Sequence, residues 1–250
     1  MNLTEEQIVQ NWEDLMEVIN KKFQGERRQK LLAMYEGFQE RMMLAPASGI
    51  EHFHNCFAGG YVDHVLRVIS CTERLYQQWE EMEADMSGYT IEELMFCALN
   101  HDLGKVGDID NEYYVPNPSE WHRKNQGKLY KFNPELDYMS VPDRSLFLLA
   151  QNGVSYTYNE AMGIRLHDGL YDDSNAQYLK TFNTDKEIKS NLPTILHHAD
   201  HMASRIEHDN YVKTSGNNLK PTQKRRKATP KLNGASSSAN DLFKDFFKED

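Results

Sequence analysis

The sequence lacks the features that mark membrane-spanning, secreted or disulfide-rich proteins. No segment approaches about eighteen consecutive apolar residues, so we expect no membrane-spanning helix. The first residues hold no basic region followed by an apolar run, so we expect no secretory signal. The three cysteines are an odd number without a Cys-x-x-Cys pair and stand among apolar neighbours, which favours buried free thiols. Together these absences predict a cytoplasmic protein with no membrane partner.

The composition is that of a globular protein. Of the 250 residues, 39% are hydrophobic and 26% are charged, which excludes a collagen-like, coiled-coil or wholly disordered chain. The net charge of −10 is unevenly spread. Residues 213–250 hold nine Lys+Arg and four Asp+Glu, whereas residues 1–212 hold 19 Lys+Arg and 34 Asp+Glu. The sequence therefore predicts an acidic body of net charge −15 with a basic tail of +5.

Apolar residues recur at helical spacing through most of the first 212 residues, so we predict a mostly α-helical fold. Thr90 and Glu93 form a capping-box pattern at the start of one such helix. Gly, Asn, Pro and Tyr are frequent between residues 104 and 142, which predicts an irregular insertion with a short β-hairpin. The expected helices cover residues 8–19, 31–38, 61–86, 91–100, 142–151, 159–166 and 192–209.

The chain divides into three expected parts. Residues 1–212 form the helical body, and residues 213–240, which are basic and rich in Ser and Asn, form a flexible linker. Residues 241–250 are aromatic again and unlike a linker. A short apolar motif after a flexible linker is typical of peptides that dock into a groove on a partner protein. Its expected contact residues are Leu242, Phe243, Phe246 and Phe247.

One of the three His-Asp pairs in the chain stands out by its context. His101 and Asp102 close an apolar helix and lead into a Gly-Lys turn, whereas the other pairs begin at residues 167 and 208. An imidazole and a carboxylate at a helix end can bind one divalent cation. Lys105 follows three residues after Asp102 and can reach a phosphate held at that cation.

Two other helices offer ligands of the same kind. His64 lies early in the expected helix 61–86, among apolar neighbours. Asp200 lies on the expected helix 192–209, where a carboxylate among apolar side chains is costly unless it is paired or metal-bound. Three buried helices that each offer His or Asp predict a divalent-metal site.

In this order the residues resemble the pattern of the HD-domain metal-dependent phosphohydrolases. Residues 59–64, with their Gly-Gly pair, resemble the segment that carries the family's first metal ligand. Residues 101–105 resemble its His-Asp-x-Gly-Lys signature, and residues 196–200 resemble the helix that carries its final Asp. The resemblance spans roughly residues 50–210 and implies an HD-domain helical bundle. It is closest to the bacterial branch that contains 3′–5′ exoribonucleases, with two departures. No N-terminal OB-fold is evident, and Asp168 stands where a second His is usual.

The resemblance implies a ligand set and roles for single residues. His64, His101, Asp102 and Asp200 would hold one divalent ion, and His167 would complete a second metal site or protonate the leaving oxygen. Mixed His and carboxylate ligands favour Mn, and Mg, Fe, Co or Ni are the alternatives. The site would hold one ion or two. The expected catalytic residues are Asp102, Lys105 and His167, and the expected substrate-binding residues are Lys105, His122 and Arg144.

The expected activity is divalent-metal-dependent hydrolysis of phosphoester bonds in nucleotides or at nucleic-acid 3′ ends. The alternative is a non-catalytic or slow nucleotide-binding adaptor of a replication complex, recruited through residues 241–250. That peptide resembles the C-terminal clamp-binding peptides of phage and cellular replication proteins, which implies a sliding clamp or another replication protein as partner. If the chain is phage-encoded, it acts in the host cytoplasm.

Overall fold

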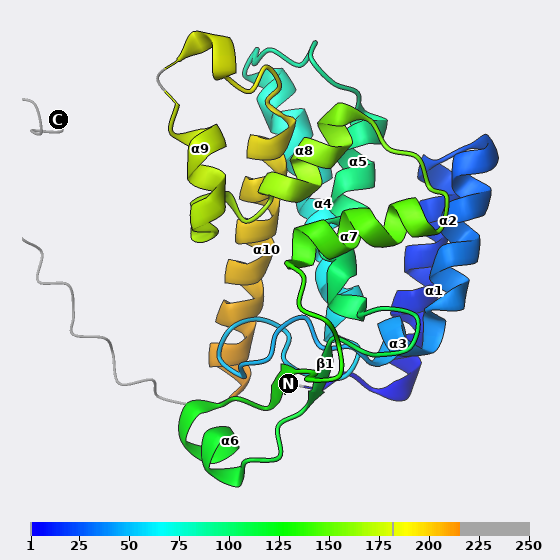
Figure 1. Cartoon of the computed structure of the whole chain (residues 1–250), viewed down its shortest axis with the longest axis vertical. Coiled ribbons are helices and arrows are strands. Elements are labelled where there is room, and N and C mark those ends of the chain that lie inside the picture. Colours follow the sequence, from blue (N-terminus) through cyan, green and yellow to red (C-terminus); the bar gives the residue numbers. More distant parts are fainter. Residues whose placement is uncertain (1, 182, 216–250) are drawn as a thin grey trace, which may run out of the picture. The chain divides into compact units, whose positions relative to one another are not determined.

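The computed structural model describes residues 2–181 and 183–215. It confirms that the chain is mostly α-helical, with one two-stranded sheet in the described part (Figure 1). None of the described helices is long and apolar enough to cross a membrane. The described α-helices are α1 (Glu5–Lys22), α2 (Gly25–Gly37), α3 (Gln39–Leu44), α4 (Gly60–Glu81), α5 (Ile91–Asn100), α6 (Glu120–Gln126), α7 (Val141–Gln151), α8 (Tyr158–Leu166), α9 (Ala176–Leu179) and α10 (Leu192–Thr214).

Side chains at the helix starts explain where several helices begin. Before α5, the Thr90 hydroxyl accepts a hydrogen bond from the Glu93 amide at 3.2 Å, and the Glu93 carboxylate accepts one from the Thr90 amide at 2.8 Å. The expected capping box is therefore confirmed. Thr4 and Thr157 form the same arrangement before α1 and α8.

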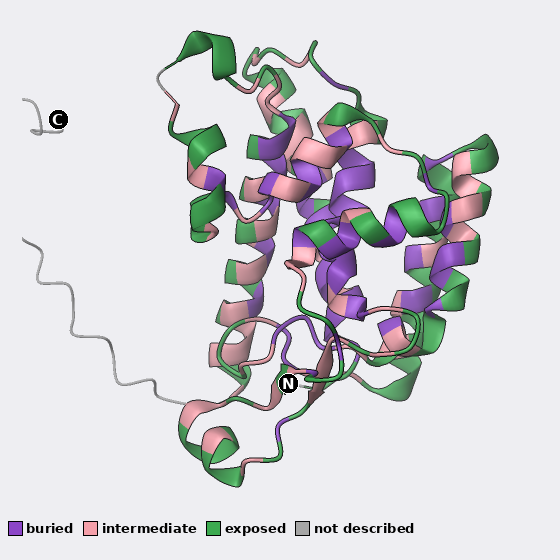
Figure 2. Ribbon diagram, viewed as in Figure 1, coloured by how far each residue is buried: buried purple, intermediate pink, exposed green. Residues whose placement is uncertain are grey.

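The core is built around α5. Every residue from Leu94 to Asn100 is buried. Helices α4, α8 and α10 all contact α5, and α10 also runs along α4. Figure 2 shows the buried faces of these helices gathered in the middle of the molecule. Burying one large apolar side chain stabilises the fold by about 1.5–3 kcal/mol. This packing therefore fixes how α4, α5, α8 and α10 lie against one another.

The expected irregular insertion lies between α5 and α7. Strands β1 (Tyr114–Pro116) and β2 (Tyr130–Phe132) pair antiparallel, with Val115 opposite Lys131. The connection between them is longer than a hairpin turn, because α6 lies there, capped by the Ser119 hydroxyl. None of the seven residues of α6 is buried, so the helix carries no apolar periodicity from which it could be predicted.

Helix α10 continues beyond its expected end at residue 209. It runs to Thr214, so the first two residues of the expected linker are helical. Lys213 lies in its last turn, where a cation interacts favourably with the helix dipole. The rest of the expected linker, residues 216–240, lies outside the described residues. So does the expected partner-binding peptide with Leu242, Phe243, Phe246 and Phe247.

Candidate metal centre

A close crossing of two backbone segments marks the start of α4 and explains the Gly-Gly pair. Gly59 has a φ of +86°, a conformation that favours glycine. A Cβ atom on Gly60 would lie 2.0 Å from the carbonyl oxygen of Asn55, so no larger residue fits there. His64 follows about one helical turn later, with its side chain buried.

His101 and His167 occupy the same local position at the ends of α5 and α8. Each caps the C-terminus of its helix, and each is followed by an aspartate and a short 3-10 helix, η1 (Leu103–Val106) or η2 (Gly169–Tyr171). In each ring, Nδ1 donates to the backbone carbonyl three residues earlier, at 2.8 Å. These bonds fix the ring orientation and leave Nε2 as the atom available for a ligand.

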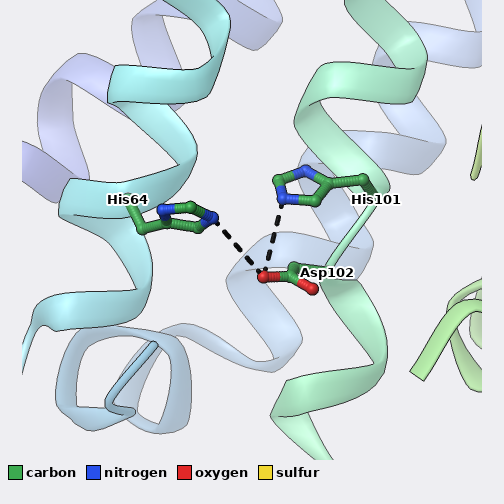
Figure 3. Close-up of side chains that lie close together, drawn as sticks. All are labelled: His64, His101 and Asp102. Carbon is green, nitrogen blue, oxygen red and sulfur yellow. Dashed lines mark ion pairs between the residues drawn. The ribbon is translucent and has the colours of Figure 1, made fainter. Parts of the chain in front are cut away.

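His64 from α4 meets His101 and Asp102 beside the end of α5 (Figure 3). Oδ2 of Asp102 lies 3.6 Å from Nε2 of His64 and 3.5 Å from Nε2 of His101. Asp200, from α10, places Oδ1 3.2 Å from Nε2 of His64. Ligand atoms bound at about 2.1 Å to one divalent ion lie about 3–4 Å apart. The spacing of His64, His101 and Asp102 therefore suits a divalent cation. We call these three residues, together with Asp200, the metal cluster.

Two buried nitrogen atoms of the metal cluster have no hydrogen-bond partner among the described residues. They are Nε2 of His64 and Nε2 of His101, which face the carboxylates of Asp200 and Asp102 at 3.2 and 3.5 Å without forming a hydrogen bond. A buried polar atom without a partner costs about 1–3 kcal/mol. A cation held between the imidazoles and the carboxylates would give both nitrogen atoms a partner. The residues present therefore fit a divalent metal.

The charges around the metal cluster also favour a cation. Burial alone would lower the pKa of His64, but Glu207 and Asp200 raise it to about 10. Burial alone would raise the pKa of Asp102, but Lys105 holds it well below its ordinary value. The buried Asp102 carboxylate therefore stays ionised and attracts positive charge, which a proton or a metal ion can supply.

A second group of ligands lies beside the metal cluster. His167, Asp168 and Asp200 each offer one ligand atom, and these atoms lie within 4.8 Å of one another. Nε2 of His167 is 3.6 Å from Oδ2 of Asp168 and 3.6 Å from Oδ1 of Asp102. Asp102 and Asp200 thus each lie close to residues of both groups. The sequence prediction did not include Asp168, although it follows His167 as Asp102 follows His101.

Glu207 is a further residue of this site that the sequence prediction missed. It lies on α10 seven residues after Asp200, and two helical turns bring both side chains to the same face. Its carboxylate accepts hydrogen bonds from Nδ1 of His64 and from Nε of Arg67, each at 3.1 Å. Glu207 is 3% exposed. The seven-residue spacing from Asp200 is the signal in the sequence that points to it.

A cavity of about 580 Å³ opens onto the two ligand groups, and Asp102, His167 and Asp200 are among its lining residues. Lys105 also lines it, with its ammonium 2.6 Å from Oδ2 of Asp102. Arg205 adds a second cation, and Phe53 and Tyr171 add aromatic rings. The histidines that line this cavity, which we call the metal-site cavity, are His52, His54, His167, His197, His201 and His208.

Two expected substrate-binding residues are not brought to the metal-site cavity. His122 lies on α6 in the insertion and is not among the residues that line the cavity. Arg144 is 3% exposed, and its Nη2 donates to the backbone carbonyl of Asp137. This guanidinium holds the loop before α7 and does not line the metal-site cavity. Arg205, from α10, lines the cavity.

Comparison with known proteins finds no matching family model, no matching curated protein and no matching solved structure. The functional argument therefore rests on the geometry of the described residues. What this geometry establishes is two groups of His and Asp that can hold a divalent metal, at a cavity that carries Lys105 and Arg205.

Proposed function

We propose that the protein is a divalent-metal-dependent phosphohydrolase of the HD-domain type. It cleaves phosphoester bonds in nucleotides or at nucleic-acid 3′ ends. The observation that carries the proposal is the cavity that opens onto both ligand groups and is lined by Lys105 and Arg205. Metal ligands beside two cationic side chains form the set of groups that hydrolysis of a phosphoester needs.

The residues of the metal cluster would hold the first ion, and His167 with Asp168 offers a place for a second. We favour Mn, because mixed imidazole and carboxylate ligands suit it better than Mg. When bound, the metal would lower the pKa of a water molecule and neutralise charge on the phosphoryl group. Glu207 accepts the hydrogen bond from Nδ1 of His64 and so keeps Nε2 of the same ring directed at the other residues of the metal cluster.

Lys105 and Arg205 supply the positive charge of the proposed active site. Lys105 stands 2.6 Å from Asp102, at the point where the metal cluster meets the cavity. Its ammonium would stabilise the negative charge that develops on the phosphoryl oxygens. Arg205 lines the same cavity and would bind a phosphate oxygen. Asp102 reaches both ligand groups through its two oxygens and would orient the attacking water.

The charge of the body favours a small or terminal phosphate as substrate. Residues 1–212 carry a net charge of −15, which repels a long polyanion. Inside the cavity, a single phosphate meets Lys105 and Arg205 instead. This contrast favours a free nucleotide, or the last phosphodiester of a strand, over internal positions of a polymer.

A metal-by-substrate screen of the full chain tests the proposal. Nucleoside mono-, di- and triphosphates, cyclic nucleotides and short oligonucleotides are each incubated with Mn, Mg, Co or Ni, and phosphate or nucleotide release is measured. We expect hydrolysis of at least one of these classes, fastest with Mn, and its loss with EDTA or with Asp102→Asn. If the protein binds metal and hydrolyses none of them, the enzyme proposal is wrong and the nucleotide-binding adaptor is favoured.

A further inference from the structure

A second cavity, of about 350 Å³, adjoins the metal-site cavity and has different chemistry. Leu166, Leu170, Leu179 and Pro193 form its walls, and none of the described residues that line it is a Lys, Arg, Asp or Glu. It lies among η2, α9 and the first turn of α10. We call it the apolar cavity.

The two cavities share Tyr171 and His197. Tyr171 is 77% exposed, and its ring lies 5.8 Å from that of His201 with an angle of 16° between the planes. The ring of His197 is held in place, because its Nδ1 donates to the carbonyl of His167 at 2.7 Å. Gly169 leaves the room for this ring, since a Cβ atom there would lie 2.5 Å from it. The border between the cavities therefore carries aromatic rings.

Adjoining cavities of opposite chemistry suit a ligand with one anionic end and one flat apolar end. A phosphate at the metal cluster meets Lys105 and Arg205. A ring system beyond Tyr171 would bury its faces against the leucines of the apolar cavity. Thr194 offers a hydroxyl there, and Nε2 of His197 offers an acceptor because its Nδ1 is already bonded. A nucleotide has both ends, whereas a sugar phosphate has only the first.

We propose that the apolar cavity binds the base of the substrate, with Tyr171 as a stacking ring, so that the substrate is a nucleotide, free or at a 3′ end. Non-nucleotide phosphoesters would leave the apolar cavity unfilled. The proposal rests on the proposed phosphohydrolase function for the identity of the phosphate site. Base recognition itself can be measured without hydrolysis.

Equilibrium binding of nucleosides tests base recognition without a phosphate. The full chain, in EDTA, is titrated with adenosine, guanosine, cytidine, uridine and their 2′-deoxy forms, and binding is followed by NMR. At least one nucleoside should bind saturably in the millimolar range or tighter. Tyr171→Ala should weaken this binding about tenfold, because it removes the stacking ring. Leu179→Trp should weaken it as well, because the larger side chain fills the apolar cavity.

Tyr158→Ala is the matched control. Tyr158 is 75% exposed, close to the value for Tyr171, and lines neither of the two cavities. This variant should bind nucleosides as the wild type does. The proposal is overturned if no nucleoside saturates the protein up to about 10 mM. It is also overturned if Tyr171→Ala and Leu179→Trp bind as tightly as Tyr158→Ala.

Hydrolysis then separates this proposal from the proposed function. The best nucleotide substrate of the screen is compared with the same sugar phosphate without its base. We expect at least about a tenfold preference in kcat/KM for the nucleotide, reduced in Tyr171→Ala mainly through KM. Equal hydrolysis of both compounds would overturn base recognition and leave the phosphohydrolase in place. Nucleoside binding without any hydrolysis would support base recognition and overturn the proposed function.

Discussion

Nδ1 of the buried His64 lies 3.1 Å from the carboxylate of Glu207, and this contact joins a residue of the metal cluster on α4 to a side chain on α10. Arg67 donates to the same carboxylate at 3.1 Å. A carboxylate that accepts from the far nitrogen of a ligating histidine fixes the tautomer and makes the ring a better ligand. Glu207 is therefore part of the site through its contact with His64, although it is not one of the four residues of the metal cluster.

Replacing Glu207 should weaken metal binding. In Glu207→Gln, one carboxylate oxygen becomes an NH₂ donor and the negative charge is lost, so His64 and Arg67 are left with a single neutral acceptor oxygen. We expect the affinity for Mn²⁺ to fall about tenfold to a hundredfold, measured by isothermal titration calorimetry. Glu73→Gln is the control, because Glu73 lies on the surface of α4 and pairs with Lys22. Equal affinities in the two variants would show that Glu207 does not position His64.

The pair His101 and Asp102 should be indispensable for the metal. A double variant, His101→Ala with Asp102→Ala, removes one imidazole and the carboxylate that lies within 3.6 Å of His64, His101 and His167. We expect it to lose Mn²⁺ binding in calorimetry while far-UV circular dichroism stays near wild type. The matched control removes an imidazole and a carboxylate from α6, Glu120→Ala with His122→Ala, which lie outside both ligand groups and do not line the metal-site cavity. Metal retained in the first variant, or lost in the second, would contradict the assignment.

Metal affinity should rise with pH. In the metal-free protein, burial lowers the pKa of His64 and His167, but carboxylates such as Glu207 and Asp168 raise these values to about 10 and about 9. Because both pKa values lie above neutral pH, both rings carry protons that a metal must displace. The apparent affinity should therefore increase about tenfold per pH unit for each proton released, until the pH reaches these pKa values. Calorimetry at about pH 6, 7 and 8 measures the slope, and an affinity that stays constant or falls over this range would contradict the prediction.

The buried ion pair between Arg27 and Glu160 should support the fold away from the metal site. Nη1 and Nη2 of Arg27 donate to the two carboxylate oxygens at 2.6 and 3.0 Å, and Glu160 is fully buried. Arg27→Met would leave that carboxylate buried without its partner, so we expect a loss of about 3–5 kcal/mol in the free energy of unfolding in urea. A second variant that also carries Glu160→Met should regain part of this loss.

An exposed pair provides the comparison for Arg27. Lys21 and Glu17 lie one turn apart on α1, at 2.5 Å, with side chains that are 67% and 58% exposed. Lys21→Met should change the free energy of unfolding by no more than about 0.5 kcal/mol. If Arg27→Met costs no more than Lys21→Met, the buried pair does not stabilise the fold as we expect.

Local sequence patterns were sufficient to predict most of the helices. The capping box at Thr90 and Glu93 and the apolar periodicity of α4, α5 and α10 depend on neighbours within about one or two turns, which the sequence displays directly. Helix α6 was missed because it buries none of its residues and so has no apolar face. The far end of α10 was missed for a related reason, because polar and aromatic residues after residue 209 continue the helix without a marked apolar face.

The sequence by itself determined which residue types can bind a metal and that they lie on helices with apolar faces. His64, His101, Asp102 and Asp200 are recognisable because imidazoles and carboxylates stand among apolar neighbours. Only the tertiary structure decided how side chains from α4, α5, α8 and α10 meet, since that depends on packing between helices far apart in the chain. This packing brings Asp168, Glu207 and Arg205 to the site and leaves Arg144 at the loop before α7.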